Sequence, residues 1–404
     1  MNITGIIAEY NPFHNGHLRH LEETRRRTGC DAVVVVMSGD FVQRGVPSVT
    51  DKYLRAEAAL RCGADLVLEL PVFGATASAE DFASAGVRAM ASLSCVRTLS
   101  YGAEDAGEAG RFRDIAGYLL SEPAEYKSRL LSHVKEGNSY AKARSLALAE
   151  FFPKASEILT KPNNILGVEY EKAILRDQTD ITTCVIERND RGYHDTQTAP
   201  VCSATAIRQA VLEQDRFPTD SVPECTKDLF AGLTRSTAVT ADDASDMLCA
   251  ELSAHTPETL SAIYDTPGDL ANRILNRTEQ PFTWTSLAES VKNKAFTRSR
   301  IDRSLCHALL HITEADADAF KASPALPYLR VLGVRKGSEQ LLSELCGSSA
   351  TPLLRRLSDD TKLLSREAQH LLSVDLRASA LYSQILFRKS GVIRQDTRRR
   401  LLTI

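Results

Sequence analysis

Short apolar runs alternate with longer segments of helical periodicity along the first 190 residues of the chain. β-branched and other apolar residues predict buried strands over 2–8, 32–37, 66–70, 96–100 and 182–188. The intervening stretches predict helices over 17–27, 51–62, 79–92, 164–177 and most of 105–160. This alternation predicts an α/β fold, a doubly wound parallel sheet whose ligands bind beyond the carboxyl ends of the strands. The loops at 10–17, 38–46 and 101–104 lie at those ends.

The pattern changes after residue 215. A looser stretch with two prolines occupies 215–223, and beyond about 240 the periodicity is helical with few strand signals. We therefore predict a nucleotide-binding catalytic domain over 1–215, a linker over 216–240 and a mostly helical region over 241–404.

Charge is distributed unevenly over these regions. The whole chain carries a formal charge of −3, but 292–400 holds 20 basic and 11 acidic residues, a balance of +9. This asymmetry favours an anionic macromolecular partner for the basic part, although a solvated helical surface would have the same composition.

The cysteines and the hydropathy indicate the compartment. Nine cysteines are widely spaced without any C-x-x-C pair, which argues against a zinc knuckle, an iron–sulfur cluster or a disulfide framework. No apolar run approaches the ~20 residues that span a bilayer, and no signal peptide pattern opens the sequence. We expect a cytoplasmic protein without a structural metal.

Two histidines provide the first candidate chemistry. His14 and His17 flank Gly16 where the first predicted strand passes into the first predicted helix. A helix N-terminus offers unpaired N–H groups and a partial positive charge, and glycine permits close approach of a ligand to the backbone. The pattern predicts a phosphate site suited to cleavage of a nucleoside triphosphate between its α- and β-phosphates.

A second candidate motif begins the helix after residue 203. Ser203 is a plausible N-cap, Thr205 adds a hydroxyl, and Arg208 follows one turn later. Hydroxyl groups and a guanidinium fork at a helix start suit phosphate oxygens. Taken alone, the motif also fits an ordinary capped helix.

These two motifs together resemble the nucleotidylyltransferase superfamily, which is related to the class I aminoacyl-tRNA synthetases and has a HIGH-type Rossmann-like fold. More narrowly, the chain resembles the tRNA(Met) cytidine acetate ligase family. The strings that carry this resemblance are found at 8–17, 37–45, 63–71, 100–104, 161–167, 191–195 and 296–303.

The resemblance implies that ATP activates acetate as acetyl-adenylate, with Mg²⁺ expected alongside ATP. The acetyl group then passes to N4 of the wobble cytidine of elongator tRNA(Met), forming N4-acetylcytidine. It implies ATP contacts at Gly102, Asn163 and Arg188, at Ser203, Thr205 and Arg208, and along the first loop and helix at Ile7, Ala8, Glu9, Tyr10, Asn11, Pro12, Phe13, His14, Asn15, Gly16, His17, Leu18, Arg19 and His20.

The resemblance also implies catalytic roles for His14, His17, Asp40 and Arg44. Asp40, Gln43 and Arg44 follow the second predicted strand, near the expected place of acetate or the target base. Asparagine is usual in the family at the position of Asp40, and a carboxylate beside acetate would be repulsive unless it were paired. His194 and Asp195 fit either a substrate contact or a solvated turn.

The expected RNA surface is basic. Residues 292–303 contribute Lys292, Lys294, Arg298, Arg300 and Arg303, a density that suits RNA phosphates. Arg398, Arg399 and Arg400 fit either an RNA contact or a charged tail. Two other functions stay open: an adenylyltransferase acting on a small cofactor precursor, and a tRNA-binding protein without catalysis.

Overall fold

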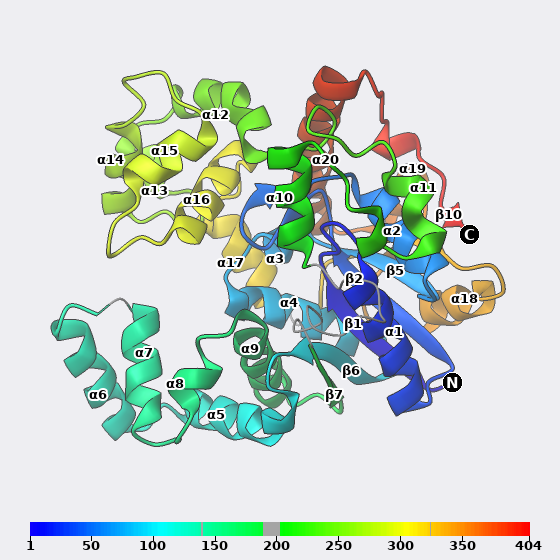
Figure 1. Cartoon of the computed structure of the whole chain (residues 1–404), viewed down its shortest axis with the longest axis horizontal. Helices are drawn as coiled ribbons and strands as arrows, with labels where there is room; N and C mark the ends of the chain where they lie inside the picture. The colour runs from blue at the N-terminus through cyan, green and yellow to red at the C-terminus, as the bar shows by residue number, and fades with distance from the viewer. Residues whose placement is uncertain (139, 189–202, 324) are drawn as a thin grey trace.

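An eight-stranded mixed sheet forms the centre of the computed structural model, which describes residues 1–138, 140–188, 203–323 and 325–404 (Figure 1). The strands run in the order β10-β8-β5-β2-β1-β6-β7, and β9 pairs with β8. All neighbours are parallel except β5 and β8. Their bounds are β1 (Ile3–Ala8), β2 (Ala32–Ser38), β5 (Leu66–Leu70), β6 (Val96–Ala103), β7 (Thr182–Glu187), β8 (Leu329–Val334), β9 (Leu353–Leu354) and β10 (Leu402–Thr403).

The strand order confirms the doubly wound α/β fold. From β1 the chain moves through β2 to β5 on one side, and then returns to place β6 and β7 on the other. The direction therefore reverses between β1 and β6, and a crevice forms there beyond the carboxyl ends of the strands. A separate antiparallel pair, β3 (Phe41–Val42) and β4 (Val46–Pro47), follows β2.

Alternating side chains of β2 pack into two hydrophobic cores, one on each face of the sheet. Val34 and Val36 pack on one face of the sheet, whereas Val33 and Val35 pack on the other, and all four are fully buried. The second of these faces is covered by α1 (Asn15–Thr28) and α2 (Lys52–Arg61). The first is covered by helices that include α3 (Val72–Ala75), α4 (Ala79–Ser92), α5 (Ala109–Ser121) and α9 (Pro162–Arg176).

Two groups of helices lie to one side of the sheet in Figure 1. The first contains α6 (Ala124–Lys135), α7 (Tyr140–Ala149) and α8 (Ala155–Ile158). The second contains α12 (Ser245–Leu252), α13 (Pro257–Ser261), α14 (Gly268–Leu275), α15 (Trp284–Val291), α16 (Arg298–Leu310) and α17 (Glu314–Ala322). Its centre is Trp284, which is fully buried and donates from Nε1 to Asp302 at 2.9 Å.

The remaining helices connect these parts. They are α10 (Ala204–Gln214), α11 (Lys227–Phe230), α18 (Glu339–Ser348), α19 (Leu357–Asp360) and α20 (Arg366–Ser390). Single 3₁₀ turns are η1 (Ala106–Glu108), η2 (Thr219–Ser221), η3 (Glu224–Thr226), η4 (Ala241–Ala244), η5 (Thr361–Leu363) and η6 (Asp396–Arg398). Among the described residues, no helix is both long and apolar enough to cross a membrane.

The part of the chain beyond 240 contains more strand than the sequence indicated. β8, β9 and β10 join the same sheet as β5, although the helical periodicity of 241–404 suggested a mostly helical region. The six residues of β8, including Arg330, are all buried, so this short segment lacks the alternation of buried and exposed positions that would separate a strand from a helix. The linker at 216–240 stays a prediction. Strands that precede it in the sequence and strands that follow it belong to the same sheet.

A buried network of charges connects the first part of the sheet to the end of the chain. Lys52 is fully buried, and its Nζ lies 2.7 Å from Glu69, 3.0 Å from Asp396 and 2.7 Å from Ser379 Oγ. Arg330 lies 2.8 Å from Asp396, and Arg394 lies 2.6 Å from Asp40. Asp396 is the first residue of η6 and Arg394 lies two residues before it, so these pairs hold the C-terminal segment against the loop after β2.

We predict that Lys52→Met strongly destabilises the protein, because Glu69 and Asp396 would then be buried without a full counter-charge. The loss of one partner from a buried ion network typically costs about 3–5 kcal/mol. Urea denaturation would measure the free energy of unfolding. Lys127→Met is the matched control: its exposed ion pair with Glu122 should leave the unfolding midpoint unchanged. Equal stability of K52M and the wild type would contradict this role.

Candidate active site

The two histidines of the first motif sit at the N-terminus of α1. His14 is the N-cap, and its Nδ1 accepts a hydrogen bond from the backbone N–H of Gly16 at 3.0 Å. His17 Nδ1 accepts from the backbone N–H of His14 at 3.2 Å, and the two ring centroids are 3.7 Å apart. Because each Nδ1 acts as an acceptor, the neutral form of each ring carries its proton on Nε2.

The environment keeps both rings neutral. Burial, reinforced by the charges of Arg188 and Arg208, lowers the pKa of His14 to about 3. Burial and the neighbouring His14 hold the pKa of His17 well below its ordinary value. Near pH 7 the site therefore presents two uncharged Nε2–H donors at the positive end of a helix.

The loop before α1 supports these rings. Tyr10 and Phe13 are buried, and their ring centroids lie 4.8 and 5.4 Å from that of His17. Farther along α1, His20 Nε2 lies 3.1 Å from Ser100 Oγ on β6. Burial lowers the pKa of His20 to about 4, so this ring is also neutral. Arg19, in contrast, is exposed.

The second motif lies against the loop that carries the first. Ser203 caps α10 by accepting from the backbone N–H of Ala206 at 3.2 Å. Arg208 donates from Nη1 to the backbone carbonyl of Asn11 at 2.6 Å and from Nη2 to Thr205 Oγ1 at 3.1 Å. Groups separated by almost 200 residues in the sequence therefore lie together beside the N-terminus of α1.

Arg188 approaches the same site from the end of β7. Its backbone N–H donates to Ala103 at 2.8 Å, and its charge contributes to the lowered pKa values of His14 and His17. A Cβ on Gly102 would lie 2.9 Å from Arg188 Cγ, so the glycine provides space for this side chain. Arg188 Nε is buried without a hydrogen-bond partner among the described residues.

Asn163 lies at the start of α9, bound to the loop that follows β6. Its Nδ2 donates to Glu104 Oε1 at 2.7 Å. The neighbouring Asn164 accepts from the backbone N–H groups of Glu104 and Asp105 at 3.0 and 3.2 Å. These bonds fix the beginning of α9 to the carboxyl end of β6, at the edge of the crevice.

Asp40 is placed differently from the rest of the predicted catalytic set. Its carboxylate is completely buried and receives two hydrogen bonds from Arg394, at 2.6 and 3.1 Å, and one from the backbone N–H of Lys52 at 3.1 Å. Although burial raises it, the charges of Arg394 and Lys52 hold the pKa of Asp40 below its ordinary value. The carboxylate is therefore paired, and both of its oxygens are engaged within the protein.

The other residues after β2 face the first motif. The backbone N–H of Gln43 donates to Glu9 Oε1 at 2.8 Å, and its side chain donates to the carbonyl of Ala77 at 2.9 Å. Arg44 is exposed, has no ion-pair partner among the described residues, and contributes to a lowered pKa of Arg208, for which burial is the main cause. Arg44 thus places a free positive charge near the two motifs.

Sequence reasoning missed the cation that holds this region together. Arg55 is fully buried and donates to the backbone carbonyls of Glu9 at 2.6 Å, Ser38 at 3.1 Å and Thr50 at 3.2 Å, with a further bond to Gly39. It therefore joins the carboxyl ends of β1 and β2. Within the predicted helix 51–62, no local signal separated Arg55 from a surface arginine.

The predicted RNA-contacting residues are largely paired with carboxylates. Arg298 binds Asp302 and Glu289, and both Arg300 and Arg303 bind Asp265, at distances of 2.7–3.0 Å. Lys292 lies 3.7 Å from Glu289, and Lys294 is exposed. A Cβ on Gly45 would lie 2.4 Å from the Cα of Arg303, so the loop after β2 packs directly on α16.

The described part of the chain contains no group of three or more histidine, cysteine or acidic residues arranged to hold a metal ion. His194 and Asp195 lie outside the described residues.

Comparisons with known proteins match this chain over nearly its whole length. The HIGH Nucleotidyl Transferase family model matches residues 1–397. A tRNA(Met) cytidine acetate ligase of Acetivibrio thermocellus is 35% identical over 406 residues, covering 97% of this chain and 98% of the relative. One from Clostridium acetobutylicum is 36% identical over 396 residues, covering 95% and 96%.

Solved structures show the same fold. Thermotoga maritima TmcAL bound with alpha-thio ATP is 28% identical and superposes with a TM-score of 0.88, covering 100% of this chain and 99% of the other. The apo form of TmcAL is 29% identical, with a TM-score of 0.90 and complete coverage of both chains.

The low pKa of His20 predicts a pH-dependent stability. Between about pH 4 and 6.5 the unfolded chain binds a proton at this histidine that the folded chain does not. The free energy of unfolding should therefore rise with pH in this window. His20→Gln should reduce the slope by up to about 1.4 kcal/mol per pH unit, measured by urea denaturation at several pH values.

The matched control is His133→Gln. The hydrogen bond to Glu136 raises the pKa of His133, so this half-buried ring is protonated in both the folded and the unfolded chain below pH 6. Its replacement should leave the slope between pH 4.5 and 6 unchanged. An unchanged slope in H20Q would mean that His20 is not held neutral by its surroundings.

Proposed function

Because the chain belongs to the tRNA(Met) cytidine acetate ligase family and matches the HIGH nucleotidyl transferases along its length, we propose that it is an ATP-dependent ligase that acetylates tRNA. Its substrates are ATP, acetate and elongator tRNA(Met). Its product is N4-acetylcytidine at the wobble position, with AMP and diphosphate released. The single observation that carries the proposal is the meeting of His14, His17 and Arg208 at the N-terminus of α1.

In the first step an acetate oxygen attacks the α-phosphorus of ATP, and the bond to the β-phosphate oxygen breaks. Negative charge accumulates on the departing diphosphate. The Nε2–H groups of His14 and His17 and the N-terminus of α1 are donors already oriented toward that charge. Arg208, Thr205 and Ser203 supply further donors at the N-terminus of α10.

The neutral state of the histidines suits this role. Each Nδ1 accepts a hydrogen bond from a backbone N–H, so the single proton of the neutral ring is on Nε2. Each ring can therefore donate a hydrogen bond to phosphate without first changing its protonation state. Arg188 and Arg44 supply the positive charge that neutral rings lack. Mg²⁺ is expected to arrive as part of the ATP complex, since phosphate oxygens are hard ligands of the kind it prefers.

In the second step cytidine N4 attacks the carbonyl carbon of acetyl-adenylate. The bond from that carbon to the adenylate oxygen breaks, AMP leaves, and N4 loses one proton. The mixed anhydride drives this step because AMP is a much better leaving group than the oxygen of free acetate. The reaction therefore needs no serine or cysteine nucleophile.

The position of acetate is proposed beside the loop after β2, where Gln43 and Arg44 follow the buried Asp40. Arg44 has the free guanidinium that a small carboxylate requires. Asp40 is proposed to position this loop through Arg394 and Lys52 rather than to contact the substrate. The 292–303 surface is proposed to bind tRNA through the exposed Lys292 and Lys294, with a smaller share from the paired arginines.

A cytoplasmic location is proposed because tRNA is the substrate and because the cysteines of the described residues are unbonded. Cys62 and Cys225 remain free thiols although their sulfurs lie only 3.6 Å apart. Such a pair is typical of a reducing compartment.

The test of the overall function is incubation of purified protein with MgATP, labelled acetate and unmodified tRNA(Met), followed by nucleoside mass analysis. Labelled N4-acetylcytidine should form only when ATP and acetate are both present. Stable transfer of AMP to a small molecule instead would identify an adenylyltransferase of a cofactor precursor. Binding of tRNA without diphosphate release would identify a non-catalytic RNA-binding protein.

The role of the histidines is tested by His17→Ala and by two substitutions of His14. His14→Asn retains an acceptor that caps α1 but lacks the ring that carries Nε2–H, whereas His14→Ala loses both. Loss of one oriented donor should lower acetate-dependent ATP–diphosphate exchange by about 10²–10³-fold in all three variants. H14N should be the more stable of the two His14 variants. Exchange at the wild-type rate in H14N and H17A would remove both rings from the chemistry.

A further inference from the structure

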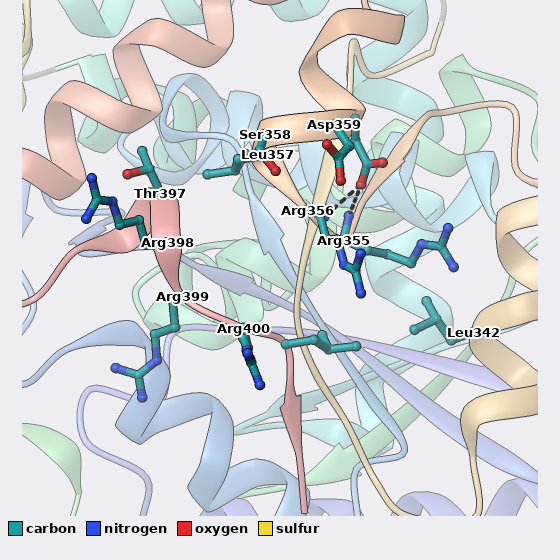
Figure 2. Close-up of a pocket in the computed structure, with 12 residues that line it drawn as sticks. Leu342, Arg355, Arg356, Leu357, Ser358, Asp359, Thr397, Arg398, Arg399 and Arg400 are labelled. Atoms are coloured by element: carbon teal, nitrogen blue, oxygen red, sulfur yellow. Dashed lines mark hydrogen bonds between the residues drawn. The ribbon is translucent and has the colours of Figure 1, made fainter.

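Five arginines surround one groove near the end of the chain. The groove has a volume of about 1250 Å³ and lies between the segment that includes α19 and the last turn of the chain. Figure 2 shows Arg398, Arg399 and Arg400 on one side, and Arg355 and Arg356 on the other. All five side chains are exposed. None of them forms an ion pair within the described residues.

Many exposed arginines elsewhere have a carboxylate within reach, as Arg26 has Glu23, Arg388 has Asp246 and Arg113 has Glu171. Others, such as Arg19 and Arg44, lack an ion pair among the described residues, so what distinguishes the groove is that five such arginines line it together. Two acidic residues, Asp359 and Asp360, do line the groove. The carboxylate of Asp360, however, accepts from the backbone N–H groups of Arg355 and Arg356 at 2.6 and 2.7 Å, as the dashed lines in Figure 2 mark. Asp360 therefore orients the backbone of the two arginines and leaves their guanidinium groups free.

The three terminal arginines are held in place rather than carried on a loose tail. On one side of them, the buried Asp396 binds Lys52 and Arg330. On the other side, β10 pairs with β8 in the sheet. Between these anchors, the guanidinium of Arg399 lies 4.2 Å from the centroid of the Tyr53 ring. The structure thus favours a formed surface over the alternative of a charged tail.

We propose that this arginine groove binds the sugar–phosphate backbone of RNA and serves as a second docking surface for the tRNA. The inference rests on the proposed function for the identity of the RNA. Five unpaired guanidinium groups repel one another unless an anion lies among them, and each fork matches a phosphate. The groove is far larger than a single phosphate needs, which indicates a polyanion.

The position of the groove is consistent with an RNA that also reaches the active site. Arg394, which binds Asp40 on the loop after β2, lies only four residues before Arg398. In Figure 1, α19 lies on one side of α10 and α16 lies on the other. In this view the arginine groove and the 292–303 surface therefore lie on opposite sides of the helix that carries Arg208. An RNA held at both surfaces would cross the site between them.

The test is the salt dependence of tRNA binding. Arg398→Ala/Arg400→Ala and Arg355→Ala/Arg356→Ala each remove two charges from one side of the groove. Within the described residues, none of these four side chains has a bonded partner whose loss would harm the fold. If each arginine contacts one phosphate, each double variant should lower the slope of log K against log salt by about 1.4–1.8. With affinities converging near 1 M salt, this is a loss of about 20-fold at 0.15 M. The loss should be equal for tRNA(Met) and an unrelated tRNA, because phosphates carry no sequence information.

Arg26→Ala/Arg388→Ala is the matched control, since it changes the net charge equally at paired arginines outside the groove. Its slope should stay at the wild-type value. Lys292→Ala/Lys294→Ala reports separately on the 292–303 surface. Wild-type affinity and slope in both groove variants, or an equal loss in the matched control, would overturn the inference.

Acetate-dependent ATP–diphosphate exchange without tRNA separates this inference from the proposed function. The groove variants should exchange at the wild-type rate, because no groove residue belongs to the nucleotide site. If the wild-type protein showed neither exchange nor acetylation while the groove variants still lost RNA affinity, the proposed function would be wrong. The inference that the groove binds RNA would then still be supported. Normal exchange with unchanged RNA affinity in the groove variants would overturn the groove alone.

Discussion

The buried ammonium group of Lys52 is the constraint on which the rest of the structure depends. It has no contact with solvent, and the carboxylates of Glu69 and Asp396 lie within 3.0 Å of it, with Asp40 at 3.7 Å. Charges without water are tolerated only when they are paired and hydrogen-bonded, so β5, α2 and the C-terminal segment must come together. The end of the chain is thereby held against α2 and β5, and the pair of Arg394 with Asp40 fixes the loop after β2 to the same segment.

This constraint extends to the active site through backbone contacts. Arg55, one turn after Lys52 on α2, binds the carbonyls of Glu9 and Ser38 and so joins the carboxyl ends of β1 and β2. The reversal of strand order between β1 and β6 opens the crevice at this edge of the sheet. Arg208 then ties α10 to Asn11 in the loop above it. A rigid scaffold of this kind suits a reaction that depends on preoriented donors more than on a reactive side chain.

Ion pairing in the folded chain distinguishes two kinds of basic residue. Where carboxylates are close, as at Asp265 beside Arg300 and Arg303, the guanidinium groups form ion pairs that hold α16 to its neighbours. Where the acidic groups are engaged with the backbone, as at Asp360, the guanidinium groups remain available to an external anion. The count of basic residues in 292–400 does not separate these cases, because only the folded chain decides which charge meets which.

Hydrophobic periodicity by itself determined the doubly wound sheet, and the histidine and Ser203 motifs marked where phosphate would be held, because both signals arise within one strand or one helix turn. Several sequence segments that resemble the tRNA(Met) cytidine acetate ligase family indicated the family. Tertiary structure alone decided that β8 to β10 join the sheet, that Asp40 is paired with Arg394 and that Arg55 joins two strands. It also decided which arginines stay free. Those outcomes depend on contacts between residues up to about 350 positions apart, and the periodicity and spacing of neighbouring residues carry no record of such contacts.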